Sequence, residues 1–282
     1  MVRVRTARTV VESPHFVIRA VECADDHARW SAPETTPAVQ IVLARRGRFR
    51  LDCRGSRVLV EPAVGYLSHP GDEVRFAHPA GGDACTSVTF TGEALAAGSG
   101  DAFSADVAAR LDAVRSAASG RPPAVRVDAR LELAHRLLLH TSADPGLAGA
   151  EAVLDLLLLA LRGQPGDAPA PGRQELADLA REAILTDDPA GADLVTLAGR
   201  LETSPSHLSH TFRHHVGMPL SRYRNRVRVS RALARLGQGE RDLAALAAGL
   251  GFSDQAHLTR VMREEAGHTP GRVRALLTAV LR

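Results

Sequence analysis

The feature that most constrains the fold of this chain is an internal repeat between residues 193 and 274. Two amphipathic segments, each broken once by a short polar stretch, recur about fifty positions apart. Apolar residues at i, i+3, i+4 and i+7 are typical of a helix with one buried face. The repeat therefore predicts one helix-turn-helix unit that occurs twice, and repeats of this kind decide a fold before local patterns do. The matched pairs are Leu194 with Leu243, Leu197 with Leu246, Ala198 with Ala247, Leu201 with Leu250, Leu208 with Leu258, Phe212 with Met262 and Gly217 with Gly267.

A helix-turn-helix unit suits double-stranded DNA. Its second helix lies in the major groove, and residues near the start of that helix reach the edges of the bases. Two units joined by one helix can enter two successive major grooves on the same side of the duplex, roughly 34 Å apart. One chain can then read what a symmetric dimer would otherwise read.

Residues 174–282 resemble the DNA-binding domain of the AraC/XylS family of bacterial transcription regulators. The resemblance is carried by LVTLAGRLETSPSHLSHTFRHHVGMPLSRYRNRVRVSRALARL and DLAALAAGLGFSDQAHLTRVMREEAGHTPGRVR. Its most specific parts are the turn at 251–254 and the stretch from Gly267 to Arg274. It implies a sequence-specific regulator whose partner is double-stranded DNA, and it leaves a second copy of the chain and RNA polymerase as further candidate partners.

The distribution of charge agrees with a nucleic-acid partner. Residues 174–282 hold 15 arginines and 12 acidic residues, whereas residues 1–173 hold 20 of each. All basic residues of the chain are arginines, a bias that a GC-rich genome can also produce. The position of the excess positive charge is therefore more informative than its size. The arginines crowd the segment between the two repeat copies, where we expect Arg222, Arg224, Arg226 and Arg228 to be candidates for phosphate contact.

The helices that enter the grooves are expected to begin near Ser204 and Asp254, which suit N-caps. The resemblance implies that Ser206, Ser209 and His210 read bases in the first copy, although such small or weak readers favour phosphate contact there. In the second copy Arg260 suits guanine and Gln255 suits adenine, with an ion pair to Glu264 or a phosphate contact as the alternative for Arg260. The complete set of expected DNA-contacting residues is Ser206, His207, Ser209, His210, Arg213, Arg226, Gln255, Ala256, His257, Thr259, Arg260 and Arg263.

The rest of the chain predicts an α+β protein of two domains. Short strand-like runs separated by Gly and Pro turns in residues 1–92 are typical of an antiparallel barrel or sandwich. The resemblance implies a cupin-like, effector-sensing barrel over 1–103. Residues 104–162 read as a helical segment for dimerisation or for packing on the barrel, and the Pro- and Gly-rich stretch 163–173 reads as a linker before the DNA-binding domain 174–282.

Four residues of the barrel form a candidate metal or redox site: Cys23, His27, His78 and Cys85. Two thiols and two imidazoles can complete a tetrahedral zinc site, with His69 as a substitute. Their spacing is not that of a standard zinc module, and buried free cysteines more often behave as small hydrophobes. Two alternatives to a metal or redox sensor remain: the barrel binds an organic effector, or the protein is a metal-dependent enzyme of the cupin type. No catalytic nucleophile with a base can be assigned.

The sequence also predicts where the protein works. The amino terminus lacks the apolar core of a signal peptide. The longest apolar run, 153–161, is interrupted by Asp155 and is far shorter than the roughly 20 residues that span a bilayer. Three scattered cysteines make no disulfide framework. We therefore expect a reduced, cytoplasmic location and no membrane partner.

Overall fold

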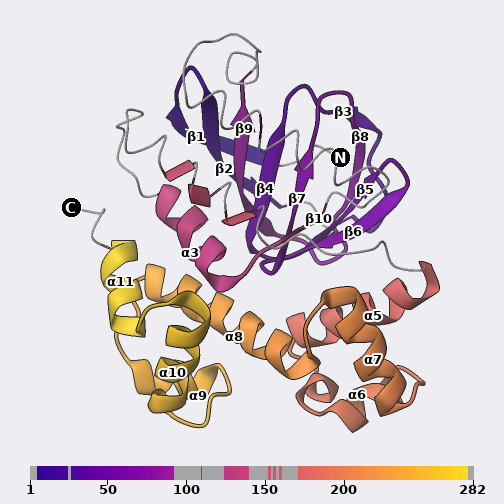
Figure 1. The fold of residues 1–282 in the computed structure, drawn as a ribbon, viewed down its shortest axis with the longest axis vertical. Helices are drawn as coiled ribbons and strands as arrows, with labels where there is room; N and C mark the ends of the chain where they lie inside the picture. The colour runs from indigo at the N-terminus through magenta and orange to yellow at the C-terminus, as the bar shows by residue number, and fades with distance from the viewer. Residues whose placement is uncertain are drawn as a thin grey trace.

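The chain divides into an amino-terminal β part and a carboxy-terminal helical part (Figure 1). The structure, a computed structural model, describes residues 5–24, 27–91, 109, 124–139, 152–153, 155–156, 159–160 and 171–278. The β part and the helical part are in contact, and the prediction of a two-domain α+β protein is confirmed. None of the described helices is long and apolar enough to cross a membrane.

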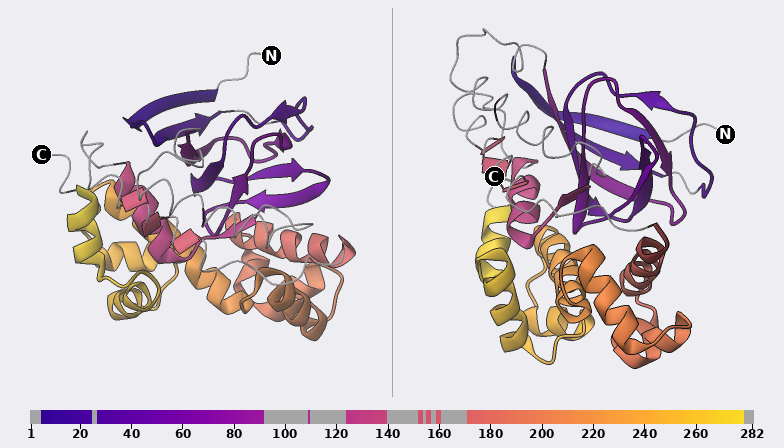
Figure 2. Two further views of the ribbon diagram at one scale, coloured as in Figure 1. Left: turned by 45° about the horizontal axis from the view of Figure 1, so that its top comes forward. Right: turned by 45° about the vertical axis from the view of Figure 1, so that its right-hand side comes forward.

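The β part consists of two antiparallel sheets that enclose an apolar core (Figure 2). The larger sheet has the order β1-β2-β9-β4-β7-β10 and the smaller has β3-β8-β5-β6. Strand order departs from sequence order because β9 returns to lie between β2 and β4. The predicted small antiparallel barrel is confirmed. The strands are β1 (Arg5–Glu12), β2 (Phe16–Cys23), β3 (Glu34–Thr35), β4 (Gln40–Arg46), β5 (Phe49–Cys53), β6 (Ser56–Val60), β7 (Val64–Ser68), β8 (Glu73–Ala77), β9 (Asp83–Phe90) and β10 (Ala124–Arg126).

The helical part contains the two predicted helix-turn-helix units. The first is formed by α6 (Leu194–Arg200) and α7 (Pro205–Val216), and the second by α9 (Leu243–Gly249) and α10 (Gln255–Ala266). The helix α8 (Leu220–Gly237), 18 residues long, joins them and runs below the barrel (Figures 1 and 2). The remaining elements are α5 (Pro171–Leu185), the 3-10 turn η1 (Pro189–Ala192) and α11 (Pro270–Thr278).

The two units end alike because the repeat places a glycine at the same point in each. Gly217 has φ 76° after α7 and Gly267 has φ 77° after α10. This left-handed conformation lets a helix end in a tight turn, and glycine adopts it without a steric penalty. The repeat therefore extends from the apolar pattern to the backbone geometry of the helix ends.

The boundary between the parts differs slightly from the expected linker 163–173. The helix α5 begins at Pro171 rather than at residue 174, while residues 163–170 lie outside the described residues. Proline is tolerated in the first turn of a helix because its missing N–H would have no intrahelical acceptor there. The Pro-rich composition thus continues into the first turn of the helix.

The buried residues described in the expected dimerisation segment 104–162 pack inside the chain. The helix α3 (Ala129–Leu138) buries Leu131 and Leu138 in the barrel core, and Ala129 and Leu133 in the core of the second unit. Further along the segment, Val153, Leu156 and Ala160 are fully buried in the barrel core. These residues therefore pack on the barrel, which is the alternative to dimerisation. The dimer role stays a prediction.

A buried ion pair joins α3 to α8. Arg226 Nη1 lies 2.7 Å from Glu132 Oε2, and both side chains are almost completely buried. The other nitrogens of Arg226 donate to backbone carbonyls of Pro62, Val127 and Asp128. Burial raises the pKa of Glu132, but the Arg226 and Arg136 cations outweigh it and lower the pKa to about 2. Glu132 is therefore a buried carboxylate held by cations from both sides of the junction.

A second buried cluster joins the barrel to the first unit. Glu61, which follows β6, accepts hydrogen bonds at Oε1 from Arg181 Nη2 at 2.7 Å and from Tyr223 Oη at 2.9 Å. Arg181 lies on α5 and also donates to the carbonyl of Leu59 at 2.9 Å. The barrel thus reaches both α5 and α8 through one fully buried carboxylate.

The buried His135 of α3 predicts a pH dependence of stability. Burial, followed by the Arg136 cation, lowers the pKa of His135 from 6.5 to about 3. The unfolded chain takes up a proton below pH 6.5 that the folded chain refuses until about pH 3, so stability is full above 6.5 and falls as the pH is lowered. The expected slope is about 1.4 kcal/mol per pH unit.

Urea unfolding between pH 7 and pH 5 measures this slope. His135→Gln is expected to lose it, and His268→Gln, at an exposed position, is expected to keep the slope of the parent chain. Equal slopes in the parent and His135→Gln would contradict the assignment.

Candidate nucleic-acid interface

The helix α7 presents one face to the protein and the other to solvent. Ser204 caps it by accepting a hydrogen bond from the His207 amide at 3.2 Å, and Pro205 occupies its first turn. Leu208 and Phe212 are fully buried, with Phe212 packed edge-on against Tyr223. The opposite face is exposed and carries all the residues expected to meet DNA in this unit: Ser206, His207, Ser209, His210 and Arg213.

The helix α10 repeats this arrangement. Asp254 caps it by accepting a hydrogen bond from the His257 amide at 2.7 Å, and that bond lowers the pKa of the Asp254 carboxyl. Leu258 and Met262 are fully buried. The expected contact residues again lie on the outer face, where Gln255, Ala256, Arg260 and Arg263 are exposed and His257 and Thr259 are half-buried.

The side chains of α10 are not equally available. His257 Nδ1 lies 3.1 Å from Ser253 Oγ, and its ring packs edge-on against Phe252. Thr259 donates its hydroxyl to the carbonyl of Gln255 at 2.9 Å. Within the described part of the chain, no ion pair joins Arg260 to Glu264. The intrahelical alternative for Arg260 is thus not formed, and its guanidinium is exposed.

The expectation that Arg226 contacts phosphate is wrong in this structure. The side chain is 1% exposed and is held by Glu132 and by three backbone carbonyls. Its partners lie on the barrel side of α8, at Pro62, at Val127 and on α3. Periodicity could not reveal this, since Glu132 is far away in the sequence and arginine is rarely fully buried.

The neighbouring arginines of α8 also make contacts within the chain. Arg222 Nε lies 3.2 Å from Glu265 of α10, and Arg224 donates to the carbonyl of Ala192. The guanidinium of Arg228 lies 5.7 Å from the Phe252 ring centre. Arg222 is still largely exposed, so phosphate contact there would exchange one partner for another. The expected phosphate cluster is thus in part the joint between the two units.

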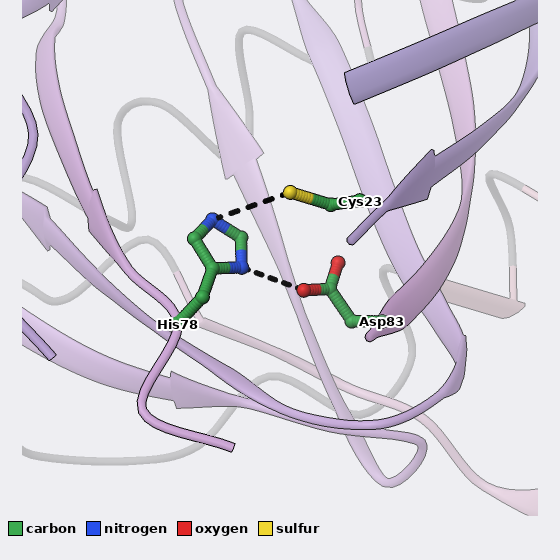
Figure 3. Close-up of side chains that lie close together, drawn as sticks. All are labelled: Cys23, His78 and Asp83. Carbon is green, nitrogen blue, oxygen red and sulfur yellow. Dashed lines mark hydrogen bonds and ion pairs between the residues drawn. The ribbon is translucent and has the colours of Figure 1, made fainter. Parts of the chain in front are cut away.

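The candidate metal residues of the barrel meet at one cavity. Cys23 Sγ lies 3.9 Å from His78 Nε2 (Figure 3). The ring centres of His27 and His78 are 5.4 Å apart. Sequence reasoning missed Asp83, whose Oδ2 accepts a 2.6 Å hydrogen bond from His78 Nδ1. Cys85 lies beside it, with Sγ 3.8 Å from Asp83 Oδ1. The signal that could have found Asp83 is its place within the interval between His78 and Cys85.

The neighbours of this chain among known proteins agree with the helical part. A family model described as a helix-turn-helix domain matches residues 197–275. Two arabinose operon regulatory proteins, from Salmonella typhimurium and Escherichia coli, are each 32% identical over 83 residues, which is 29% of this chain. The match spans less than a third of those relatives, 30% and 28% of their lengths.

The similarity to solved structures is weak, with low TM-scores. ToxT from Vibrio cholerae, with an unsaturated fatty acid bound, has a TM-score of 0.34 at 10% identity, covering 95% of this chain and 97% of that one. A cupin superfamily protein from Desulfitobacterium hafniense has a TM-score of 0.27 at 13% identity, covering 30% of this chain and 76% of that one.

The buried position of Arg226 predicts that its loss affects stability. Arg226→Ala leaves Glu132 buried without its main cation, and removal of one partner from a buried pair costs about 3–5 kcal/mol. Denaturant unfolding at neutral pH measures the effect. The exposed control Arg213→Ala is expected to change stability by less than about 0.5 kcal/mol. Equal, small effects of both variants would show that the pair does not hold the junction.

Proposed function

We propose that the chain is a sequence-specific, DNA-binding regulator of transcription of the AraC/XylS type, because it carries two helix-turn-helix units joined by one helix. The observation that carries the proposal is the outer face of the two repeated helices α7 and α10. Each buries an apolar stripe and exposes polar and cationic side chains that can reach base edges or phosphates. The matched relatives are regulators, so this function takes precedence over a cupin-type enzyme.

We propose that α10 discriminates between DNA sequences more strongly than α7 does. Gln255 begins α10 and Arg260 lies in its middle; both are exposed, and they suit bidentate contacts with adenine and guanine, respectively. The face of α7 offers serines and a histidine, which support fewer bidentate contacts, with Arg213 beside them for phosphate. Specificity therefore resides mainly in the half-site that α10 contacts, and the half-site of α7 contributes affinity.

The barrel is the regulatory part in this proposal. An effector bound in it acts through the two buried clusters, because Glu61 and Glu132 are the points where barrel and α3 hold α8. Binding energy can bias the domain arrangement only if the effector favours one arrangement over another. A second copy of the chain and RNA polymerase are proposed as further partners, and the cytoplasm, where bacterial DNA lies, as the location.

Binding to operators selected from a random DNA pool tests the two reader roles. Arg260→Ala is expected to lose discrimination at one base pair of the site, by about 1–3 kcal/mol, because a bidentate contact is removed. Arg213→Ala is expected to weaken binding to all sequences alike and to lower the dependence of log K on log salt by about 0.9, the value for one phosphate contact.

The matched control is Arg75→Ala, which removes a half-exposed arginine on β8 of the barrel. It is expected to bind as the parent chain does. If Arg260→Ala and Arg213→Ala kept identical base preferences, the assignment of Arg260 as a reader would be wrong. If the parent chain selected no sequence from the pool, the proposed function itself would fail.

A further inference from the structure

The barrel encloses a small cavity whose lining combines metal-binding side chains from four separate places. The cavity measures about 60 Å³ and is lined by Cys23, His27, His78, Asp83 and Cys85, together with apolar side chains that include Phe49 and Tyr66. Cys23 ends β2 and Asp83 begins β9, and the two are paired in the sheet register. His27 follows β2 and His78 follows β8, with the His78 amide donating to the His27 carbonyl at 2.8 Å.

The imidazole of His78 is oriented as a ligand. Its Nδ1 lies 2.6 Å from Asp83 Oδ2 and donates to that carboxylate, while Nε2 faces Cys23. Histidines that bind metals almost always donate their other N–H to a carboxylate or carbonyl in this way. Nε2 and Cys23 Sγ are 3.9 Å apart, close to the roughly 3.6 Å expected between nitrogen and sulfur ligands of a tetrahedral zinc ion.

His27 has the same orientation with a different acceptor. Its Nδ1 donates to the carbonyl of Arg29 at 2.6 Å, so Nε2 is again the basic nitrogen of the ring. Its ring meets that of His78 edge-on, at 5.4 Å between centres. Two imidazoles and one thiol therefore border the same cavity. Ligand atoms of Cys23, His78 and Asp83 lie within 4.8 Å of one another, and His27 lies outside that group.

The charges of this group balance around a divalent cation. The side chain of Asp83 is 5% exposed and that of His78 is 11% exposed, so a net charge here would be costly. A Cys23 thiolate and the Asp83 carboxylate together neutralise a dipositive ion. Asp83 belongs to the same group of neighbouring ligand atoms, but its Oδ2 is held by the nitrogen of the His78 ring opposite to the one that faces Cys23, so we assign it to orienting that ring. Cys85 donates its thiol to Asp83, which places it outside the ligand set.

We propose that the barrel binds one zinc-class divalent ion through Cys23 Sγ and His78 Nε2, with His27 Nε2 drawn in from the edge of the cavity as the third ligand. Asp83 is the positioning residue for His78. Three protein ligands leave the fourth tetrahedral position to water or to a small exchangeable ligand. The site deepens the proposed function by naming the class of effector, and its regulatory role rests on that function, whereas metal binding itself does not.

Titration of the metal-free full chain, without DNA, tests the site. Co²⁺ serves as the spectroscopic probe and Zn²⁺ as its competitor. We expect one Co²⁺ per chain, with a sulfur-to-cobalt charge-transfer band that Zn²⁺ abolishes. Cys23→Ser is expected to lose the band and at least about 10-fold in affinity, and Asp83→Asn to keep the band with affinity 10–100-fold lower, as for loss of a residue that orients a ligand.

Cys53→Ser is the matched control, because it removes a buried sulfur on β5 that does not line the cavity. It is expected to bind Co²⁺ as the parent chain does. A parent chain that unfolds cooperatively but binds no Co²⁺, or a band lost equally in Cys53→Ser, overturns the site. If Cys23→Ser does not fold, His27→Gln and Asp83→Asn decide, and unchanged affinity in both overturns it.

DNA binding is measured separately on the same preparations, with and without Zn²⁺. Sequence-specific DNA binding without any metal binding overturns the site and leaves the proposed function standing. Metal binding by the parent chain that depends on Cys23, with no sequence selected from DNA, supports the site and removes the proposed function. A change in operator affinity on adding Zn²⁺, absent in Cys23→Ser, supports both.

Discussion

The arrangement of the whole molecule depends on the buried ion pair between Arg226 and Glu132. Removing two charges from water costs several kcal/mol, and the cost is offset only when geometry and further hydrogen bonds are good. Here Arg226 also donates to three carbonyls, while Glu132 accepts from Arg136 and from Ser230. The pair is stable only when α3 and α8 are both in place, because either charge alone would be buried without its partner. The contact between the two helices should therefore form cooperatively.

This constraint determines the relative position of the two helix-turn-helix units. The first unit is held to the barrel by the Glu61 cluster, which is polar, and the second by the apolar face of α3. The helix α8 takes part in both contacts. The separation and rotation of α7 and α10 are therefore set by the barrel as well as by the connecting helix. In the proposed function, a ligand that alters the barrel can therefore shift α7 and α10 without touching either helix.

The sequence predicted features that depend on residues close together in the chain. It did not predict contacts between segments that are far apart in the chain. The repeat located both units, the caps Ser204 and Asp254, and the outer faces, because helix period and capping are local properties. Arg226 was misassigned, since a row of arginines on a helix looks alike whether it faces DNA or a buried carboxylate. Asp83 was missed because its relation to Cys23 arises from the pairing of β2 with β9, which spacing does not show.

The Glu61 cluster has a consequence for how such proteins diverge. Glu61, Arg181 and Tyr223 lie on three separate segments, yet each buried group depends on the other two. A change at one position alone leaves a buried charge or hydroxyl without its partner, so descendants should keep the trio or replace it together. The outward residues of α7 and α10 carry no such mutual dependence. If α7 and α10 read DNA as proposed, operators can therefore change one base at a time while the buried trio is inherited as a unit.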